Sequence, residues 1–99
     1  MEKFKNEDVG VEFKIPKRPK VGALLRYWSA LSATRNEYDM FERYWKAAVL
    51  LIADLKCDYL TAETDLDEID DIRAVEAVKY IGLTTWVFIQ ELEGIPKNS

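Results

Sequence analysis

The chain has 99 residues, of which 48% are hydrophobic and 32% are charged, with no histidine, one cysteine and a formal net charge of −4. This length indicates one small domain, and a single cysteine excludes a disulfide within the chain. Without histidine, a zinc site would depend almost wholly on carboxylates, and Cys57 has no imidazole to activate it as a nucleophile. We therefore expect a protein that is not an enzyme and has no catalytic residue, bound metal or cofactor.

Charge and hydropathy also restrict the partners. Residues 57–99 carry a net charge of −7, and a nucleic-acid-binding domain of this size is usually basic, so we expect no nucleic-acid partner. The longest apolar run, Ala47 to Ala53, is far shorter than the roughly 20 residues that cross a bilayer. The N-terminal MEKFKNEDVG lacks the apolar core of a secretory signal, so we expect a cytoplasmic protein without a membrane partner.

Residues 1–20 are predicted to form an N-terminal arm. Its first eight residues are polar and expected to be loose, and apolar residues then alternate with other residues, which predicts a half-buried strand. The alternating apolar residues are Val9, Val11, Phe13 and Ile15. Because a lone strand leaves its backbone groups unpaired, this arm either lies extended on the helices or pairs with another copy or another protein.

A basic cluster of Lys17, Arg18 and Lys20 follows that strand. It is interpreted either as a solvated turn or as a contact for an acidic surface, such as residues 58–71 or an acidic partner.

Two helices are predicted next. The first begins near Pro19, which suits a first helical turn, and its apolar stripe is Val21, Leu24, Leu25, Trp28 and Leu31. The second spans Asn36 to Cys57, with Asn36 as its N-cap and a stripe at helical spacing. That stripe is Phe41, Trp45, Ala48, Ile52 and Leu55. A short loop between the two helices would make them an antiparallel hairpin.

Residues 58–71 contain seven acidic residues and no basic residue. They lack the glycine and the spacing of a calcium-binding EF-hand loop, so we expect a solvated loop in which Leu66 and Ile69 tuck under the next helix as a short helical turn.

A third helix is predicted from near Asp70 or Asp71 to about Glu93. Gly82 in its middle is explained by the close approach of another helix, under one of the tryptophans. Gly94 and Pro96 would end the helix. Its predicted inner face is Ile72, Val75, Val78, Ile81, Trp86, Ile89 and Leu92.

The predicted fold class is therefore all-α, a small three-helix domain with an extended or β-strand N-terminal arm. The arm covers residues 1–20, the helical domain residues 21–94, and a C-terminal tail residues 95–99.

The chain carries more large aromatic residues than three small helices can bury, and the surplus is expected to form a protein-binding or self-association patch. The candidate partner-binding residues are Tyr27, Trp28, Tyr44, Trp45, Trp86 and Phe88. The sequence does not distinguish core aromatic residues from surface ones, and it leaves the oligomeric state open.

Several segments together carry a resemblance to a known family. They are FKIPKRPKVGALLRYWSA, the segment YDMFERYWKAAVLLIADLKCD, the acidic linker, the closing helix and the ending EGIPKNS. In layout the chain resembles the tail assembly chaperones of long-tailed, siphovirus-type phages, and specifically their short form. The resemblance implies a helical protein of the host cytoplasm that binds the phage tape measure protein, keeps it soluble and helps the tail tube to polymerise, without entering the mature virion.

Many members of that family are also made in a longer form by a −1 ribosomal frameshift, and the resemblance implies that the extension of this form recruits the tail tube protein. Pro96, Lys97 and Asn98 can be encoded CCA AAA AAC, which contains the slippery heptamer A AAA AAC in the required frame. Two other functions remain open. One is a structural virion component, such as a head–tail connector or neck protein, and the other is a small regulatory adaptor that binds a host protein.

Overall fold

The computed structural model describes residues 1–32 and 40–93. It contains a three-stranded antiparallel sheet in the order β1-β2-β3, formed by Glu2–Asn6, Val11–Ile15 and Ala53–Lys56. The helices are α1 (Val21–Leu31), α2 (Met40–Ala48) and α3 (Arg73–Leu92), with a short 3-10 helix, η2 (Leu66–Glu68), before α3. The prediction of an all-α fold is therefore wrong, because helices and a sheet build this domain together.

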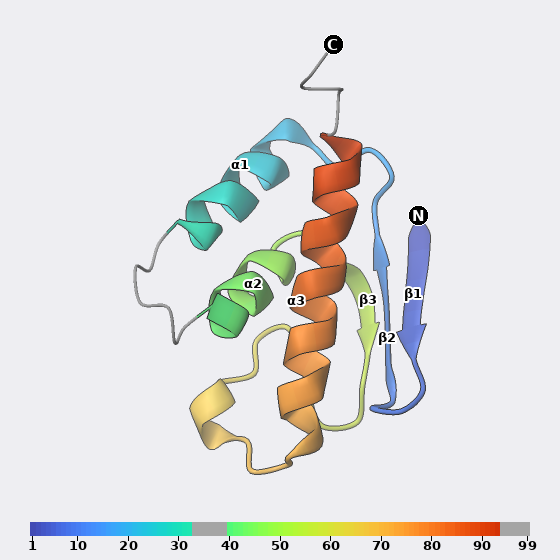
Figure 1. Cartoon of the computed structure of the whole chain (residues 1–99), viewed down its shortest axis with the longest axis vertical. Coiled ribbons are helices and arrows are strands. Elements are labelled where there is room, and N and C mark those ends of the chain that lie inside the picture. The colour runs from blue at the N-terminus through green and yellow to red at the C-terminus, as the bar shows by residue number, and fades with distance from the viewer. Residues whose placement is uncertain (33–39, 94–99) are drawn as a thin grey trace.

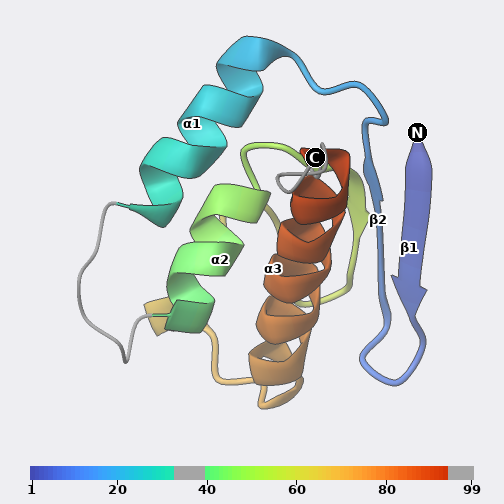
Figure 2. The same cartoon turned by 45° about the horizontal axis from the view of Figure 1, so that its top comes forward.

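The helix α3 is the central element of the fold. It lies between the sheet on one side and α1 and α2 on the other (Figure 1), and the second view shows the same arrangement (Figure 2). From the sheet, Val11, Phe13 and Ile15 point into the core, where they join Ile81 and Ile89 of α3. The predicted strand thus supplies one wall of the same hydrophobic core that the helices enclose.

The strands β1 and β2 form a hairpin, in which Phe4 pairs with Phe13. The Asp8 backbone N–H donates to Asn6 Oδ1 at 3.0 Å, and Gly10 adopts a φ of +68°, which glycine tolerates without strain. Residues 1–8, expected to be loose, therefore contain a paired strand. The predicted strand pairs within its own chain and also packs on α3, so it does not need a second copy to satisfy its backbone.

The second predicted helix, Asn36 to Cys57, is wrong in its second half. The helix α2 ends at Ala48, and Ala53–Lys56 forms β3 along the free edge of β2. Pairing with β2 gives hydrogen-bond partners to backbone groups that would otherwise stay unpaired. The local preference for helix, indicated by Ile52 and Leu55 at helical spacing, is weaker than this pairing. The predicted N-cap, Asn36, lies outside the described residues.

The strand β3 contains an irregularity, because Lys56 pairs with Glu12 whereas Ala53 pairs with Lys14. The extra residue of β3 therefore lies between Ala53 and Lys56, where Asp54 has a φ of +54°. Such a bulge bends an edge strand and strengthens its twist.

The first and third predicted helices are confirmed, although their buried faces differ from those predicted. In α1 the buried side chains are Tyr27 and Leu31, whereas Val21 and Leu25 are 71% and 65% exposed. On the third helix Val78, Ile81 and Ile89 are buried as predicted. Of the other predicted inner-face residues, Ile72, which directly precedes α3, is 81% exposed, and Val75 and Leu92 are 49% and 40% exposed. Because α3 contacts the sheet as well as α2, small residues such as Ala77 and Thr85 complete its buried surface.

Two smaller predictions are confirmed. The helical turn η2 forms within the acidic loop, and Leu66 and Ile69 pack against the core. Gly82 lies where α2 approaches α3, close to the backbone of Trp45. The predicted stop at Gly94 and Pro96 lies outside the described residues.

Among the helices of the described ranges, none combines the length and apolar character needed to span a membrane.

Candidate functional site

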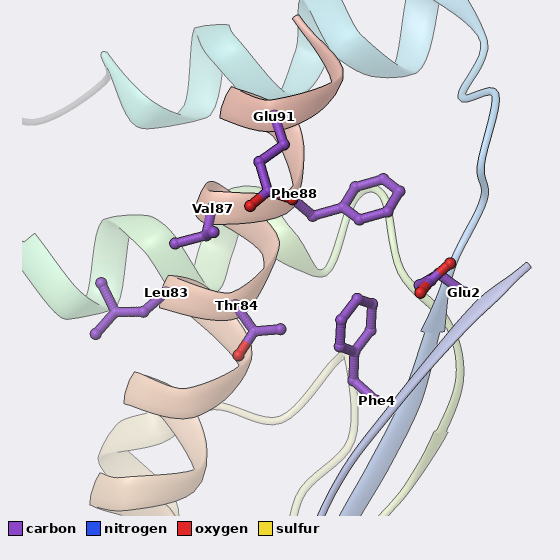
Figure 3. Close-up of a pocket in the computed structure, with 7 residues that line it drawn as sticks. All are labelled: Glu2, Phe4, Leu83, Thr84, Val87, Phe88 and Glu91. Carbon is purple, nitrogen blue, oxygen red and sulfur yellow. The ribbon is translucent and has the colours of Figure 1, made fainter. Parts of the chain in front are cut away.

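An open groove of about 580 Å³ runs between β1 and the C-terminal half of α3 (Figure 3). Two of the residues that line it come from the strand and the other five from one side of the helix. They are Glu2, Phe4, Leu83, Thr84, Val87, Phe88 and Glu91. A groove of this kind, formed by one strand and one helix, can receive a side chain or a helical face of another protein.

Aromatic contacts hold the strand side of the groove in place. The Phe4 ring stacks on Phe13 with a centroid distance of 5.5 Å and meets Phe88 edge to face at 6.0 Å. Since Phe13 is fully buried, these contacts anchor the rings of the groove to the core. The base of the groove is therefore preformed rather than assembled on binding.

The helix side presents aliphatic side chains to solvent. Leu83 and Val87 are four residues apart, so they lie on one face of α3, and they are 38% and 47% exposed. Contact with a partner would remove this apolar surface from water, at about 25 cal/mol per Å².

The charged residues that line the groove are both acidic. Figure 3 shows Glu2 beside the strand and Glu91 on the last turns of α3, and no basic side chain lines the groove among the described residues. The groove therefore favours an apolar segment that carries basic residues at its flanks.

The structure separates the six predicted partner-binding residues into different environments. Tyr27 and Trp45 are core side chains, 0% and 2% exposed, and burial raises the pKa of the Tyr27 phenol. Tyr44 and Trp86 are half-buried and stack on each other, with ring centroids 6.0 Å apart. Tyr27 and Trp45 are therefore inaccessible to a partner in this conformation.

The other two predicted residues lie nearer the surface. Trp28 is half-buried, and its Nε1–H donates to Glu93 Oε2 at 2.8 Å, which connects α1 to the end of α3. Phe88 is the one member of the predicted set that lines the groove. The structure thus does not gather the six aromatic residues into one patch.

Most of the residues that line the groove were not predicted from the sequence, namely Phe4, Leu83, Thr84, Val87 and Glu91. One signal for Phe4 was available, since it is the sole apolar residue between Glu2 and Asp8. No local signal marks Leu83 and Val87, because their exposure depends on how α3 is rotated against the sheet.

A second group of polar side chains lies beyond β3. The Arg73 guanidinium is 4.4 Å from the centre of the Tyr59 ring and pairs with Asp71, with an Nη2 to Oδ2 distance of 2.6 Å. Burial raises the pKa of Tyr59 to about 12, and its hydroxyl donates to the Val9 carbonyl oxygen. These contacts join the loop after β3 to the hairpin and to α3, which is a structural role.

Within residues 1–32 and 40–93, no three His, Cys, Asp or Glu side chains are grouped so that they could hold a metal ion.

Comparisons with protein-family models, with curated proteins and with solved structures found no match to this chain.

Proposed function

We propose that this protein is a tail assembly chaperone of a long-tailed phage, in its short form, and that it binds the tape measure protein. The resemblance of residues 13–30, 38–58 and 93–99 to that family motivates the proposal. The observation that carries it is the preformed, solvent-exposed apolar groove between β1 and α3, with acidic residues at its rim.

The mechanism is binding rather than chemistry. An amphipathic helix of the tape measure protein would place its apolar face against Leu83, Val87 and the Phe4 ring. Basic residues at the flanks of that helix would lie close to Glu2 and Glu91. Covering the apolar face of a long helix in this way would keep it from aggregating until the tail tube forms around it.

The negative charge of the chain supports the same role. A chaperone that covers an apolar partner must keep the complex soluble, and a net charge away from zero does so. This chain carries −4 overall, with −7 in residues 57–99. On this proposal the protein acts in the host cytoplasm, is absent from the mature virion, and contacts the tail tube protein through a longer frameshift product.

Substitution of Val87 tests the groove. We expect Val87→Asp to abolish co-purification with the co-expressed tape measure protein, while the circular dichroism spectrum and melting temperature stay close to those of the wild type. Leu50→Asp is the matched control, because Leu50 is also 47% exposed but lies outside the groove. Equal binding by the wild type and Val87→Asp would count against the groove.

Two further measurements separate the remaining functions. Mass spectrometry of purified particles would find a head–tail connector or neck protein and would not find a chaperone. Pull-down of a host protein in the absence of any phage protein would favour a regulatory adaptor.

Reading the codons of Pro96 to Asn98 and the following −1 frame tests the longer product. Codons that do not form a slippery heptamer, or an immediate stop codon in the −1 frame, exclude that product.

A further inference from the structure

A second groove, which the proposed function does not use, lies at the other end of α3. We call it the η2 groove. It has a volume of about 260 Å³ and lies between η2, the start of α2 and the first half of α3. Its apolar lining comes from Phe41, Leu66, Ile69, Ala74, Val75 and Val78. Its two charged lining residues are both engaged within the chain, Asp71 with Arg73 and Lys79 with Glu76. Val75 remains 49% exposed, so this apolar surface is open to solvent.

The exposed loop residues next to the lining of the η2 groove are acidic. Asp67, Glu68 and Asp70 flank the lining residues Leu66 and Ile69, and all three are exposed. None of the three forms an ion pair within the described ranges, whereas Asp71 is already paired with Arg73. An occupant of this groove therefore needs an apolar anchor with unpaired basic residues beside it.

The same chain carries such a surface at the start of α1. Lys17, Arg18 and Lys20 are exposed and make no ion pair with any described residue. Directly after them, Val21 and Leu25 are exposed by 71% and 65%, and their spacing of four places them on one face of the helix.

This helix start also lacks negative partners of its own. The N-cap, Lys20, makes no side-chain capping bond, and the first turn of α1 contains no acidic residue. Basic residues beside a helix N-terminus are unfavourable, because the helix dipole is positive there. Carboxylates supplied by another molecule would compensate both the dipole and the cluster.

The two surfaces cannot meet within one molecule. Figure 1 shows the connection from β2 to α1 at one end of the long axis and η2 at the opposite end. We propose that copies of this chain associate head to tail, with the basic start of α1 in one copy docked in the η2 groove of the next. A contact between two different surfaces is heterologous, so it extends into a ring or an open chain rather than stopping at a symmetric dimer.

Sedimentation velocity over a range of concentrations tests the association. We expect species larger than the monomer at high protein concentration in low salt, and fewer of them in high salt, because salt screens exposed charges. Leu25→Asp and Val75→Asp should each weaken the association tenfold or more, roughly the loss expected when one buried aliphatic contact is removed. Val87→Asp, in the groove between β1 and α3, should leave it unchanged.

Mixing the two variants tests the head-to-tail geometry. The Leu25→Asp chain keeps its η2 groove, and the Val75→Asp chain keeps its α1 surface, so the mixture should form a 1:1 complex although each variant alone stays monomeric. A charge exchange provides a second test: Arg18→Glu should weaken association, and mixing it with Asp67→Lys should restore binding.

Several outcomes would overturn the proposal. They are a wild type that is monomeric at every concentration in low salt, an association that Leu25→Asp leaves intact, or two variants that do not complement each other. Binding of an unrelated basic peptide to the groove of a strictly monomeric chain would instead assign the groove to a different protein. Because the proposed function depends on Val87, its failure and the failure of this association are measured separately.

Discussion

Gly82 on α3 lies directly against Tyr44 on α2. A Cβ atom built on Gly82 would be 2.8 Å from the Tyr44 Cβ and 3.1 Å from the Trp45 backbone nitrogen. The first contact is shorter than real Cβ atoms show, and backbone atoms cannot move aside as the end of a side chain can. The absence of a side chain at Gly82 therefore sets how closely the two helices approach.

Replacing Gly82 should reverse the usual effect of this substitution in a helix. Glycine to alanine normally stabilises a helix interior by about 1 kcal/mol, whereas overpacking costs about 1–3 kcal/mol. We expect Gly82→Ala to lower the free energy of unfolding by about 1–2 kcal/mol in urea titrations. Gly22→Ala is the control, because its Cβ would meet only the flexible Arg26 Nη1 at 3.4 Å. A loss of stability in Gly22→Ala equal to that in Gly82→Ala would contradict the explanation.

The helices could be predicted from the sequence because their signals are local. Apolar residues at helical spacing identify α1, the first half of the second predicted helix, and α3, and the position of Gly82 already indicated a close helix contact. The strand β3 was missed because Ile52 and Leu55 continue the helical spacing of the preceding apolar residues, so the periodicity gives no sign that the helix ends at Ala48. In Ala53–Lys56 the side chains alternate between half-buried and exposed, but that signal covers four residues only.

The strand β1 was missed for a different reason. Phe4 is its one large apolar residue, so its sequence shows no alternation, and its stability comes from pairing with β2. The groove depends on that pairing, since Phe4 reaches α3 only when β1 is in place. Tertiary contacts of this kind cannot be read from local periodicity, and for the same reason the sequence did not separate core aromatic residues from surface ones.

The backbone of Asp54 provides a second prediction. Its φ of +54° is unfavourable for a residue with a branched Cβ, and we expect Asp54→Val to lower the free energy of unfolding by about 1–2 kcal/mol. Asp54→Asn is the control, since asparagine tolerates this conformation. It removes an exposed ion pair, Lys14 Nζ to Asp54 Oδ2 at 3.4 Å, which is worth about 0–1 kcal/mol. Similar losses in the two variants would show that charge, not backbone conformation, is responsible.

The Glu12 carboxylate provides a pH-dependent prediction. Burial alone would raise its pKa, but Lys3 and Lys56 hold the pKa below its ordinary value of 4.5. The Nζ atoms of these lysines lie 3.6 and 3.5 Å from the Glu12 carboxylate oxygens. A lowered pKa in the folded state means that the ionised carboxylate stabilises the fold above pH 4.5, and that this stabilisation is lost as the pH falls through the lowered pKa.

Glu12→Gln removes that dependence. We expect the wild type to exceed Glu12→Gln in free energy of unfolding at neutral pH, and the difference to shrink as the pH falls below 4.5. High salt should reduce the difference at neutral pH, because it screens the ion pairs. A difference that is the same at acidic and neutral pH would mean that Glu12 acts through packing rather than charge.

The stacked pair Tyr44 and Trp86 decides whether the remaining predicted aromatic residues bind a partner or support the fold. Both rings are half-buried, pack against the core and lie 29° from parallel, so each contacts the other rather than pointing into solvent. A double-mutant cycle with Tyr44→Leu and Trp86→Leu should give a coupling energy of about 0.5–1.5 kcal/mol in the free protein. Each single variant should also melt at a lower temperature and, once folded, retain binding to the tape measure protein, because the groove residues Leu83 and Val87 are unchanged. Loss of binding at unchanged melting temperature would instead make this pair part of the contact surface, and the groove would then extend from β1 across α3 to α2.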